Sequence, residues 1–284
     1  HGRTLHVAEG TRLCKAGVAG QPVSEQLDVR VYLYRELIGG LSYISCCTRP
    51  DITWIVNQLA RYSNDPRQAH WDLAIGVLQY LKHTSNWGIC LGQGGDFRDF
   101  IVDNVDDVDQ ETKGKKRMQP DLDAPAPGAV AYSDANHGTG VDDKKSISGM
   151  IMHVYGGPVS WSSKVHHVTS LSSCESEFSA MSTASREALW LSKILALFDV
   201  PHRPFTIRGD SLSAISSIRN NTLTKYTKHV EIHLDFMKDY YKKSVLGFDY
   251  ICGKWNPADV LTKALGKFKF EQFRAMIGMK PAMD

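Results

Sequence analysis

Four acidic residues stand where their carboxylates could meet. Asp134 and Asp210 each follow an apolar stretch that is typical of a strand. Glu177 opens a long helix with an apolar stripe, and Asp259 follows Pro257 where a last helix should begin. Functional groups of α/β sheets commonly project from strand ends, so neighbouring parallel strands would bring the two aspartates together. Because both helix starts can point at the same sheet edge, the sequence predicts one site with four carboxylates.

Such a cluster predicts a particular chemistry. Carboxylates that crowd together repel one another unless a cation neutralises them, and hard oxygen ligands select magnesium or manganese over zinc. Two such ions, about 3.5–4 Å apart, can activate a water and brace an in-line attack on a phosphodiester. A single acid at a helix start is more often a cap, so only the joint placement favours metal-dependent hydrolysis of a nucleic-acid backbone.

A mixed α/β sheet is expected to position these acids. A long helix is predicted over 175–198, and a closing helix should follow Asp259. Apolar stretches bounded by turn residues predict strands at 129–133, 149–155, 159–161, 205–208 and 248–251. Along the chain, strands are followed by a helix and then by further strands. This order indicates an α/β domain over 129–284.

The earlier part of the chain shows a helical pattern. One helix is expected over 34–45, and residues 1–91 together should form a small helical unit. A second helix should follow Asn64-Asp65-Pro66, with an apolar stripe formed by Trp71, Ala74, Ile75, Leu78 and Leu81. Residues 92–128 are rich in Gly, Asp, Lys and Pro, which predicts a flexible linker or insertion.

Composition excludes several classes of protein. The 284 residues are 42% hydrophobic and 23% charged, which indicates a globular chain, and no apolar run is long enough to span a membrane. The six cysteines form no CxxC pair, so we expect reduced, mostly buried thiols rather than disulfides or a structural zinc site. The formal charge of +2 is indecisive about nucleic acid. Because the chain begins with His1 rather than Met, we expect a piece of a longer protein.

The motifs around the four acids resemble the ribonuclease H domain of copia-type LTR retrotransposon polyproteins, in the same order. They are Tyr132-Ser133-Asp134-Ala135, Ser173-Cys174-Glu175-Ser176-Glu177-Phe178, Gly209-Asp210-Ser211, Thr227-Lys228-His229-Val230-Glu231-Ile232 and Ala258-Asp259-Val260-Leu261-Thr262-Lys263. The stretches 34–39 and 48–52 resemble the segment that joins reverse transcriptase to ribonuclease H in that family, so 1–91 is expected to be a remnant of the thumb and connection region. The resemblance spans about 34–265 and, as an ordered set, is highly specific.

The resemblance implies a function as well as a fold. It implies a ribonuclease H-like mixed five-stranded sheet flanked by helices and preceded by the small helical unit. Asp134, Glu177, Asp210 and Asp259 would bind two Mg²⁺ ions, with Mn²⁺ as a substitute, and the enzyme would cut the RNA strand of RNA–DNA hybrids during reverse transcription. The expected partners are the hybrid, the reverse transcriptase and other parts of a polyprotein, with no membrane. The expected place is the cytoplasm, virus-like particles within it, or the nucleus.

Further residues are candidates for contact with the substrate. Lys228 and His229, near a helix start, could touch the phosphate backbone, although a solvated helix face explains them equally well. Trp255 could stack on a base and Asn256 lies beside it. Trp161 and Trp190 stand between apolar neighbours and are therefore expected in the core. Ser211 is expected to cap its helix rather than act in catalysis. The pair His166-His167 is expected in an exposed loop without a metal role.

Two features of the sequence keep other functions open. The family usually has an acid and a tryptophan where this chain has Asn136 and His137, and an arginine and a tyrosine where it has His233 and Leu234. No YxDD-like tract occurs, so DNA synthesis by this chain is not expected. The alternatives are a catalytically inactive remnant or host-recruited nucleic-acid-binding module, and a DNA nuclease or integrase-like enzyme on the same architecture.

Overall fold

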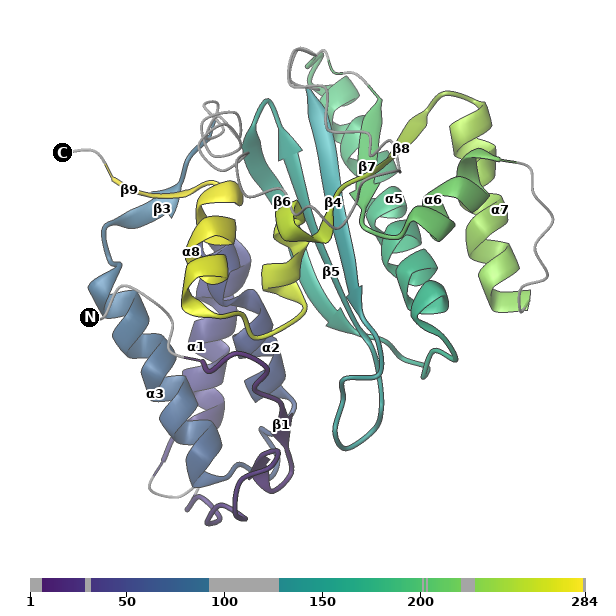
Figure 1. Ribbon diagram of the computed structural model, residues 1–284. Helices are drawn as coiled ribbons and strands as arrows, with labels where there is room; N and C mark the ends of the chain where they lie inside the picture. Colours follow the sequence, from purple (N-terminus) through teal and green to yellow (C-terminus); the bar gives the residue numbers. More distant parts are fainter. Residues whose placement is uncertain are drawn as a thin grey trace, which may run out of the picture.

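A five-stranded mixed sheet lies at the centre of the protein (Figure 1). The computed structural model describes residues 7–28, 32–91, 128–200, 202, 204–220 and 228–282, without the side chains of 228 and 229. The strands of this sheet are β4 (Ala129–Asn136), β5 (Ile147–Val154), β6 (Gly157–Val165), β7 (Phe205–Gly209) and β8 (Leu246–Tyr250). The ribonuclease H-like mixed sheet expected from the sequence is confirmed.

The strand order is β6-β5-β4-β7-β8, which places β4 at the junction of two pairing modes. β4 and β6 run antiparallel to β5, whereas β4, β7 and β8 run parallel to one another. Tyr132 of β4 is in register with Arg208 of β7. Asp134 and Asp210 each lie two residues beyond this pair, so the two aspartates reach the same edge of the sheet.

Two strands are longer than the sequence pattern predicts. β4 continues to Asn136, so Asp134 lies within the strand and pairs with Gly149 instead of following the strand. β6 continues to Val165 through polar residues. As an edge strand of the sheet it pairs with β5 alone, and polar side chains are tolerated there because one side of the strand faces solvent.

Three helices cover one face of the sheet and bury a core against it (Figure 1). They are α5 (Ser173–Leu197), α6 (Leu212–Arg219) and α7 (Lys228–Lys242). On α5 the predicted stripe is buried at Phe178, Met181 and Ala188, where it meets Phe205 and Ile207 of β7. This packing fixes the first turn of α5 beside the sheet edge that carries the aspartates.

The opposite face is covered by helices from both ends of the chain (Figure 1). The α-helices are α1 (Tyr34–Cys47), α2 (Thr53–Ala60), α3 (Gln68–His83) and α8 (Lys267–Met276), and the 3₁₀ helices are η1 (Pro50–Ile52), η4 (Gly253–Trp255) and η5 (Pro257–Leu261). Ile55 and Leu59 of α2 share one core with Ile151 of β5, Val260 of η5 and Phe273 of α8. The early helices therefore pack directly on the sheet and on the C-terminal segment.

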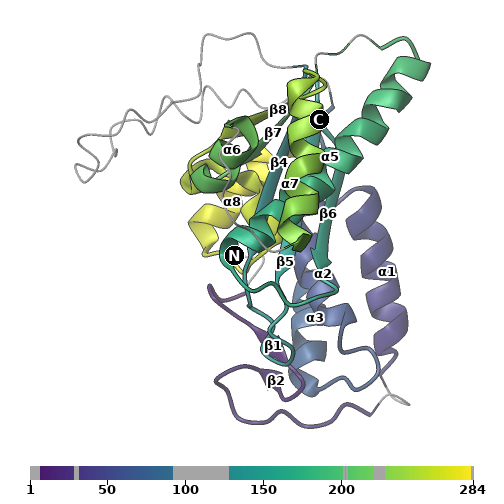
Figure 2. The ribbon, with the colours of Figure 1, turned by 90° about the vertical axis from the view of Figure 1, so that its right-hand side faces the viewer.

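A pair of short strands also joins distant parts of the chain. β3 (Trp87–Ile89) pairs antiparallel with β9 (Met279–Pro281), and the N-terminal β1 (Leu13–Cys14) pairs with β2 (Gly17–Val18). In the view of Figure 2, β1 and β2 lie at the end of the molecule where α2 ends and α3 begins. The division at 91 and 128 stays a prediction, but one hydrophobic core and one strand pair link the two parts that it separates.

A buried polar cluster fixes α3 and α8 to the segment that precedes α2. Arg49 binds both carboxylate oxygens of Asp51 and also donates to Thr84. The Tyr80 hydroxyl donates to Asp51, and Arg274 of α8 donates to Tyr80. The members are almost fully buried, so these hydrogen bonds satisfy groups that would otherwise be costly in the interior.

Three expectations for side chains need correction. The buried face of α3 contains Ala74, but Leu78 is 39% exposed, so the buried stripe is rotated to His70, Ala74, Val77 and Tyr80. His70 replaces an apolar residue because its ring nitrogen bonds backbone carbonyls of the β1–β2 turn. Trp190 is 55% exposed rather than core. All six cysteines are free thiols, but only Cys14 is buried.

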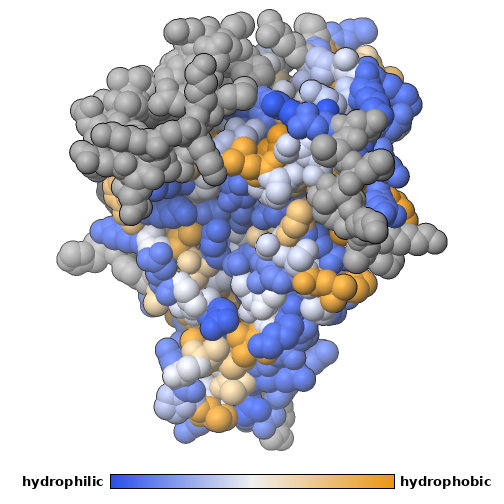
Figure 3. Space-filling view, turned by 45° about the vertical axis from the view of Figure 1, so that its right-hand side comes forward, coloured by the Kyte–Doolittle hydropathy of each residue, from blue (hydrophilic) through white to orange (hydrophobic). Residues whose placement is uncertain are grey.

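Polar residues dominate the face of the molecule shown in Figure 3, where apolar residues form separated patches among them. Within the described residues, no helix combines the length and the apolar content that crossing a membrane requires. The predicted linker or insertion at 92–128 lies, apart from Gly128, outside the described residues.

Candidate active site

Three carboxylates from three different elements meet at one edge of the sheet. Asp134 comes from β4, Glu177 from the first turns of α5, and Asp210 from the residue that follows β7. One oxygen from each lies within 4.8 Å of the others, which is the spacing expected of ligands around one metal ion. We call this set the carboxylate triad.

The start of α5 decides which glutamate faces the triad. The Ser172 side chain accepts a hydrogen bond from the backbone N–H of Glu175, which caps the helix. The Glu175 carboxylate in turn accepts a hydrogen bond from the Leu171 backbone at 2.7 Å, outside the triad. Glu175 is therefore used in capping, and Glu177 is the glutamate that points at the sheet edge.

Glu177 carries the strongest electrostatic penalty in the triad. Burial, then repulsion by Asp134 and Asp210, raises its pKa to about 9. Its Oε2 is buried and has no hydrogen-bond partner among the described residues. A buried carboxylate oxygen without a partner is costly, so this atom is suited to a ligand that the protein itself does not supply.

The pKa values of Asp134 and Asp210 are raised as well. Burial, then the charge of Asp259, raises the pKa of Asp134 to about 7 and also raises the pKa of Asp210. Asp134 is only 2% exposed and accepts a hydrogen bond from the Thr262 hydroxyl. These shifts show that the protein alone leaves negative charge at this edge incompletely balanced.

Asp259 lies beside the triad but is held by two lysines. It sits in η5, a 3₁₀ turn, rather than at the start of the closing α-helix that the sequence predicts. Lys263 Nζ lies 2.8 Å from its Oδ1, and Lys269 Nζ lies 2.7 Å from its Oδ2. The structure thus brings Asp134, Glu177 and Asp210 together, whereas the fourth predicted acid is ion-paired next to them.

Lys263 also faces the triad, which the sequence pattern did not indicate. Its Nζ lies 3.7 Å from Asp134 Oδ2. Although burial lowers the pKa of Lys263, the charges of Asp134 and Asp259 raise it overall, so this lysine stays protonated. The spacing of four residues between Asp259 and Lys263 is a signal that could have suggested their contact.

A glycine lets η5 approach the sheet. A Cβ at Gly149 of β5 would lie 2.7 Å from a Thr262 methyl carbon and 2.9 Å from the Ala258 carbonyl oxygen. Only glycine leaves room for η5 at this point, directly across from Asp134 in the antiparallel register. The close approach is what brings Thr262 and Asp259 to the triad.

The residues predicted to bind the substrate lie in different environments. The side chains of Lys228 and His229 lie outside the described structure, so their role stays a prediction. Trp255 is partly buried and packs on the core that α1, α2 and α8 share. Asn256 is fully buried, donates to the Ser133 carbonyl and accepts from the Ala258 N–H. Asn256 therefore links η5 to β4, and its buried side chain is not accessible to a substrate.

Two smaller expectations can be compared with the structure. The Ser211 side chain accepts a hydrogen bond from the Ala214 N–H and caps α6, as predicted. His167 is exposed as expected, whereas His166 is partly buried between the hydroxyls of Ser148 and Ser170. Burial lowers the pKa of His166, which favours its neutral form and a structural role.

Comparisons with known proteins point to one family, although no family model matches the chain. A retrovirus-related Pol polyprotein from transposon TNT 1-94 of Nicotiana tabacum is 29% identical over 257 residues, which are 90% of this chain and 17% of that protein. The secreted RxLR effector protein 161 of Plasmopara viticola is 30% identical over 159 residues, 56% of this chain and 91% of that protein.

The solved structure of LC11-RNase H1, isolated from compost, aligns with 47% of this chain and 91% of its own, at 17% identity and a TM-score of 0.38. A retrovirus-related Pol polyprotein from transposon RE2 of Arabidopsis thaliana is 28% identical over 87% of this chain. The chain spans 17% and 15% of the two transposon polyproteins named here. These relatives are retrovirus-related Pol polyproteins from plant transposons, and the likeness is consistent with the ribonuclease H region of a copia-type polyprotein.

Proposed function

We propose that the chain is a magnesium-dependent ribonuclease H that hydrolyses the RNA strand of RNA–DNA hybrids during reverse transcription of a retrotransposon. The carboxylate triad is the observation that supports this most directly. Its three oxygens lie within 4.8 Å of one another, and Glu177 Oε2 is buried without a partner among the described residues. Oxygen donors without any sulfur or imidazole suit Mg²⁺ or Mn²⁺.

The proposed roles follow from the contacts of each residue. Asp134, Glu177 and Asp210 would hold the metal, which when bound supplies an activated water and a counter-charge for the phosphate. The Thr262 hydroxyl fixes one oxygen of Asp134, so the carboxylate keeps its orientation. The hydrophobic packing of α5 holds Glu177 at the strand ends. The metal role predicted for Asp259 is the part with the least support, because both its oxygens are ion-paired.

The parent polyprotein supplies the proposed partners. We propose that the hybrid comes from the reverse transcriptase of the same polyprotein, and that the early helices are what remains of its thumb and connection region. The Pol polyprotein relatives and the packing of α1 to α3 on the sheet support this proposal. On this view the protein acts where reverse transcription occurs, in cytoplasmic virus-like particles or in the nucleus.

A cleavage assay tests the proposal. The purified chain with Mg²⁺ should cut the RNA of a hybrid and leave duplex DNA and duplex RNA of the same sequence intact. Asp134→Asn and Asp210→Asn should each lower the rate by about 10³-fold or more, because each removes a ligand of a unit that acts together. Cleavage of duplex DNA would favour the alternative nuclease.

The rival function is a catalytically inactive, nucleic-acid-binding remnant. The substitution of Asn136 and His137 for the usual acid and tryptophan favours it, since only Ala135 separates these residues from Asp134. The Asn136 amide donates to the Thr262 carbonyl, so it is occupied within the fold. Tight hybrid binding without turnover in either Mg²⁺ or Mn²⁺ would decide for the remnant.

A further inference from the structure

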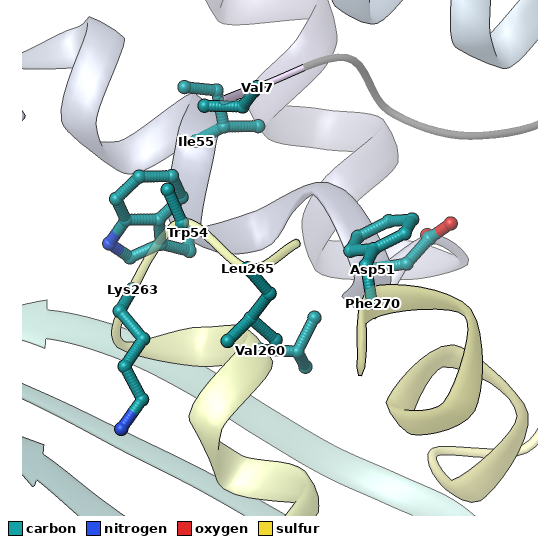
Figure 4. Close-up of a pocket in the computed structure, with 9 residues that line it drawn as sticks. Val7, Asp51, Trp54, Ile55, Val260, Lys263, Leu265 and Phe270 are labelled. Atoms are coloured by element: carbon teal, nitrogen blue, oxygen red, sulfur yellow. The ribbon is translucent and has the colours of Figure 1, made fainter. Parts of the chain in front are cut away.

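One aromatic ring of α8 lies outside the core that the rest of the helix helps to form. Phe270 and Phe273 are buried in that core, and Phe270 lines a small pocket with Trp54 and Leu265 (Figure 4). Phe268, by contrast, is 74% exposed. Residues two apart on an α-helix point about 200° from each other, so Phe268 faces away from the core. Packing within the described residues does not account for this side chain.

Two lysines flank this ring in the sequence. Lys267 is exposed, and the Lys269 side chain is 36% exposed. Glu9, which lies beside Gly266 at the N-cap of α8, opposes part of this positive charge. We call Lys267, Phe268 and Lys269 the α8 surface. It combines an exposed aromatic ring with two ammonium groups.

The α8 surface adjoins the carboxylate triad. Lys269 Nζ lies 2.7 Å from Asp259 Oδ2, and Lys263 Nζ lies 2.8 Å from Asp259 Oδ1. Lys263 Nζ is also 3.7 Å from Asp134 Oδ2. Consecutive ion pairs thus connect the start of α8 to the triad, so a nucleic-acid strand held at the triad is within reach of this surface.

The composition of the α8 surface favours a nucleic acid over a protein as its partner. The cores of protein–protein interfaces are depleted of charged residues, whereas Phe268 stands between two lysines. A base can stack on an aromatic face while ammonium groups contact the neighbouring phosphates, and such binding tolerates any base sequence. The bases inside a duplex are already stacked on one another, so an unpaired base is the ligand that suits the ring.

We propose that the α8 surface binds an unpaired strand that continues from the hybrid, with Phe268 stacked on one base and Lys267 in contact with a phosphate. Lys269 holds the surface beside the triad through its ion pair with Asp259. The inference rests on the function proposed above, because the strand is taken to be part of that substrate. The preferred substrate is then a junction between hybrid and single strand rather than a blunt hybrid.

Equilibrium binding tests this preference without any turnover. Fluorescence anisotropy would compare a blunt hybrid with hybrids that carry a short single-stranded extension at either end of either strand, all with 2′-O-methyl groups on the RNA. The full chain should bind at least one extended hybrid more tightly than the blunt one. Phe268→Ala should weaken binding of that hybrid by about 5- to 140-fold, the range for one lost base stack, and leave binding of the blunt hybrid unchanged. Phe268→Trp should keep the preference.

A second exposed phenylalanine provides the matched control. Phe198, the C-cap of α5, is 71% exposed, and Phe198→Ala should bind every hybrid as the wild type does. The melting temperature of Phe268→Ala should equal that of the wild type, because the ring is not part of the core. Equal wild-type affinities for blunt and extended hybrids would overturn the inference, and so would an equal loss on both in Phe268→Ala.

Salt dependence tests the phosphate contact of Lys267. For the preferred extended hybrid, Lys267→Gln should reduce the slope of log affinity against log salt concentration by about 0.7, the value for one phosphate of a single strand. The exposed Lys280 of β9 is the control, and Lys280→Gln should keep the wild-type slope. An unchanged slope in Lys267→Gln would contradict the contact.

The same measurements separate this inference from the ribonuclease H proposal. A wild type that cuts hybrids but has no preference for extended ones contradicts this inference alone. A wild type that prefers extended hybrids but cuts none contradicts the ribonuclease H proposal and leaves the binding surface standing. If Phe268 instead packs on a second copy of the chain, the wild type should sediment as a dimer and Phe268→Ala as a monomer, which would also overturn the inference.

Discussion

Two buried polar clusters of this protein differ in how their charges are balanced. In the Arg49 cluster, Asp51 is bound by a bidentate arginine and by the Tyr80 hydroxyl, and Arg274 joins from α8. In the carboxylate triad, Glu177 Oε2 is buried without a hydrogen-bond partner among the described residues, and burial and the charges of Asp134 and Asp210 raise the pKa of Glu177. Both oxygens of Asp51 are bound within the fold, whereas one oxygen of Glu177 is not.

This difference separates a structural cluster from a functional one. A buried ion pair whose carboxylate is fully hydrogen-bonded can hold elements together, here α3 and α8. A group of acids with raised pKa values costs stability, so a fold keeps it only where something else is gained. We therefore expect the triad to destabilise the metal-free fold and to bind a cation, and the Arg49 cluster to stabilise the fold.

The largest effect is expected from a substitution that breaks the Arg49 cluster. Asp51→Asn should lower the free energy of unfolding by about 3–5 kcal/mol, because it leaves the Arg49 charge buried without its partner. Glu177→Gln, the matched change at the triad, should leave the metal-free protein as stable as the wild type or more so. Urea denaturation of both variants with EDTA compares them. Equal losses in the two variants would erase the distinction between the clusters.

A smaller effect is expected from a substitution that disturbs packing rather than charge. Gly149→Ala should lower the free energy of unfolding by about 1–3 kcal/mol, because its Cβ overpacks against η5. It should also weaken Mn²⁺ binding, since Thr262, the residue that follows η5, orients Asp134. Gly247→Ala in β8, where the nearest atom to the new Cβ is 3.1 Å away, is the control. Unchanged metal affinity in Gly149→Ala would show that η5 does not shape the site.

A third effect is a dependence of the metal-free stability on pH. The pKa of Glu177 is about 9 in the fold against an ordinary 4.5, so the folded protein binds more protons between these values. Metal-free stability should therefore fall as pH rises through this window, by at most about 1.4 kcal/mol per unit. Asp134 adds to the fall up to pH 7. Urea titrations at pH 6 and 8.5 should show the fall in EDTA, and Mg²⁺ should reverse it. Stability that rises with pH in EDTA would refute the shifts.

The sequence predicts the sheet and three of the grouped acids because their signals are local. Turn residues bound the apolar stretches, and Asp134, Glu177 and Asp210 each stand at the edge of such a pattern. The partners of Asp259 are less accessible to this reasoning. Lys263 is four residues away, but Lys269 comes from α8, and only the packing of α8 on η5 brings it within 2.7 Å.

The packing of the early helices could not be predicted for the same reason. An apolar stripe says that a helix face is buried but not what covers it. The core that joins α2 to β5 and α8 depends on contacts between residues about a hundred or more positions apart. Likewise, the sequence alone suggests that His70 is a polar surface residue. Only the structure shows that its ring contacts the backbone carbonyls of Cys14 and Gly17.

The most direct test of the account is the position of a bound metal. Crystals of the wild-type chain grown with Mn²⁺ should give an anomalous difference peak in contact with Asp134, Glu177 and Asp210. Lys263 and Lys269 should still pair with Asp259 in the same crystals. A map with no peak at the triad, or with a peak bound through Asp259 in place of its lysines, would contradict the account.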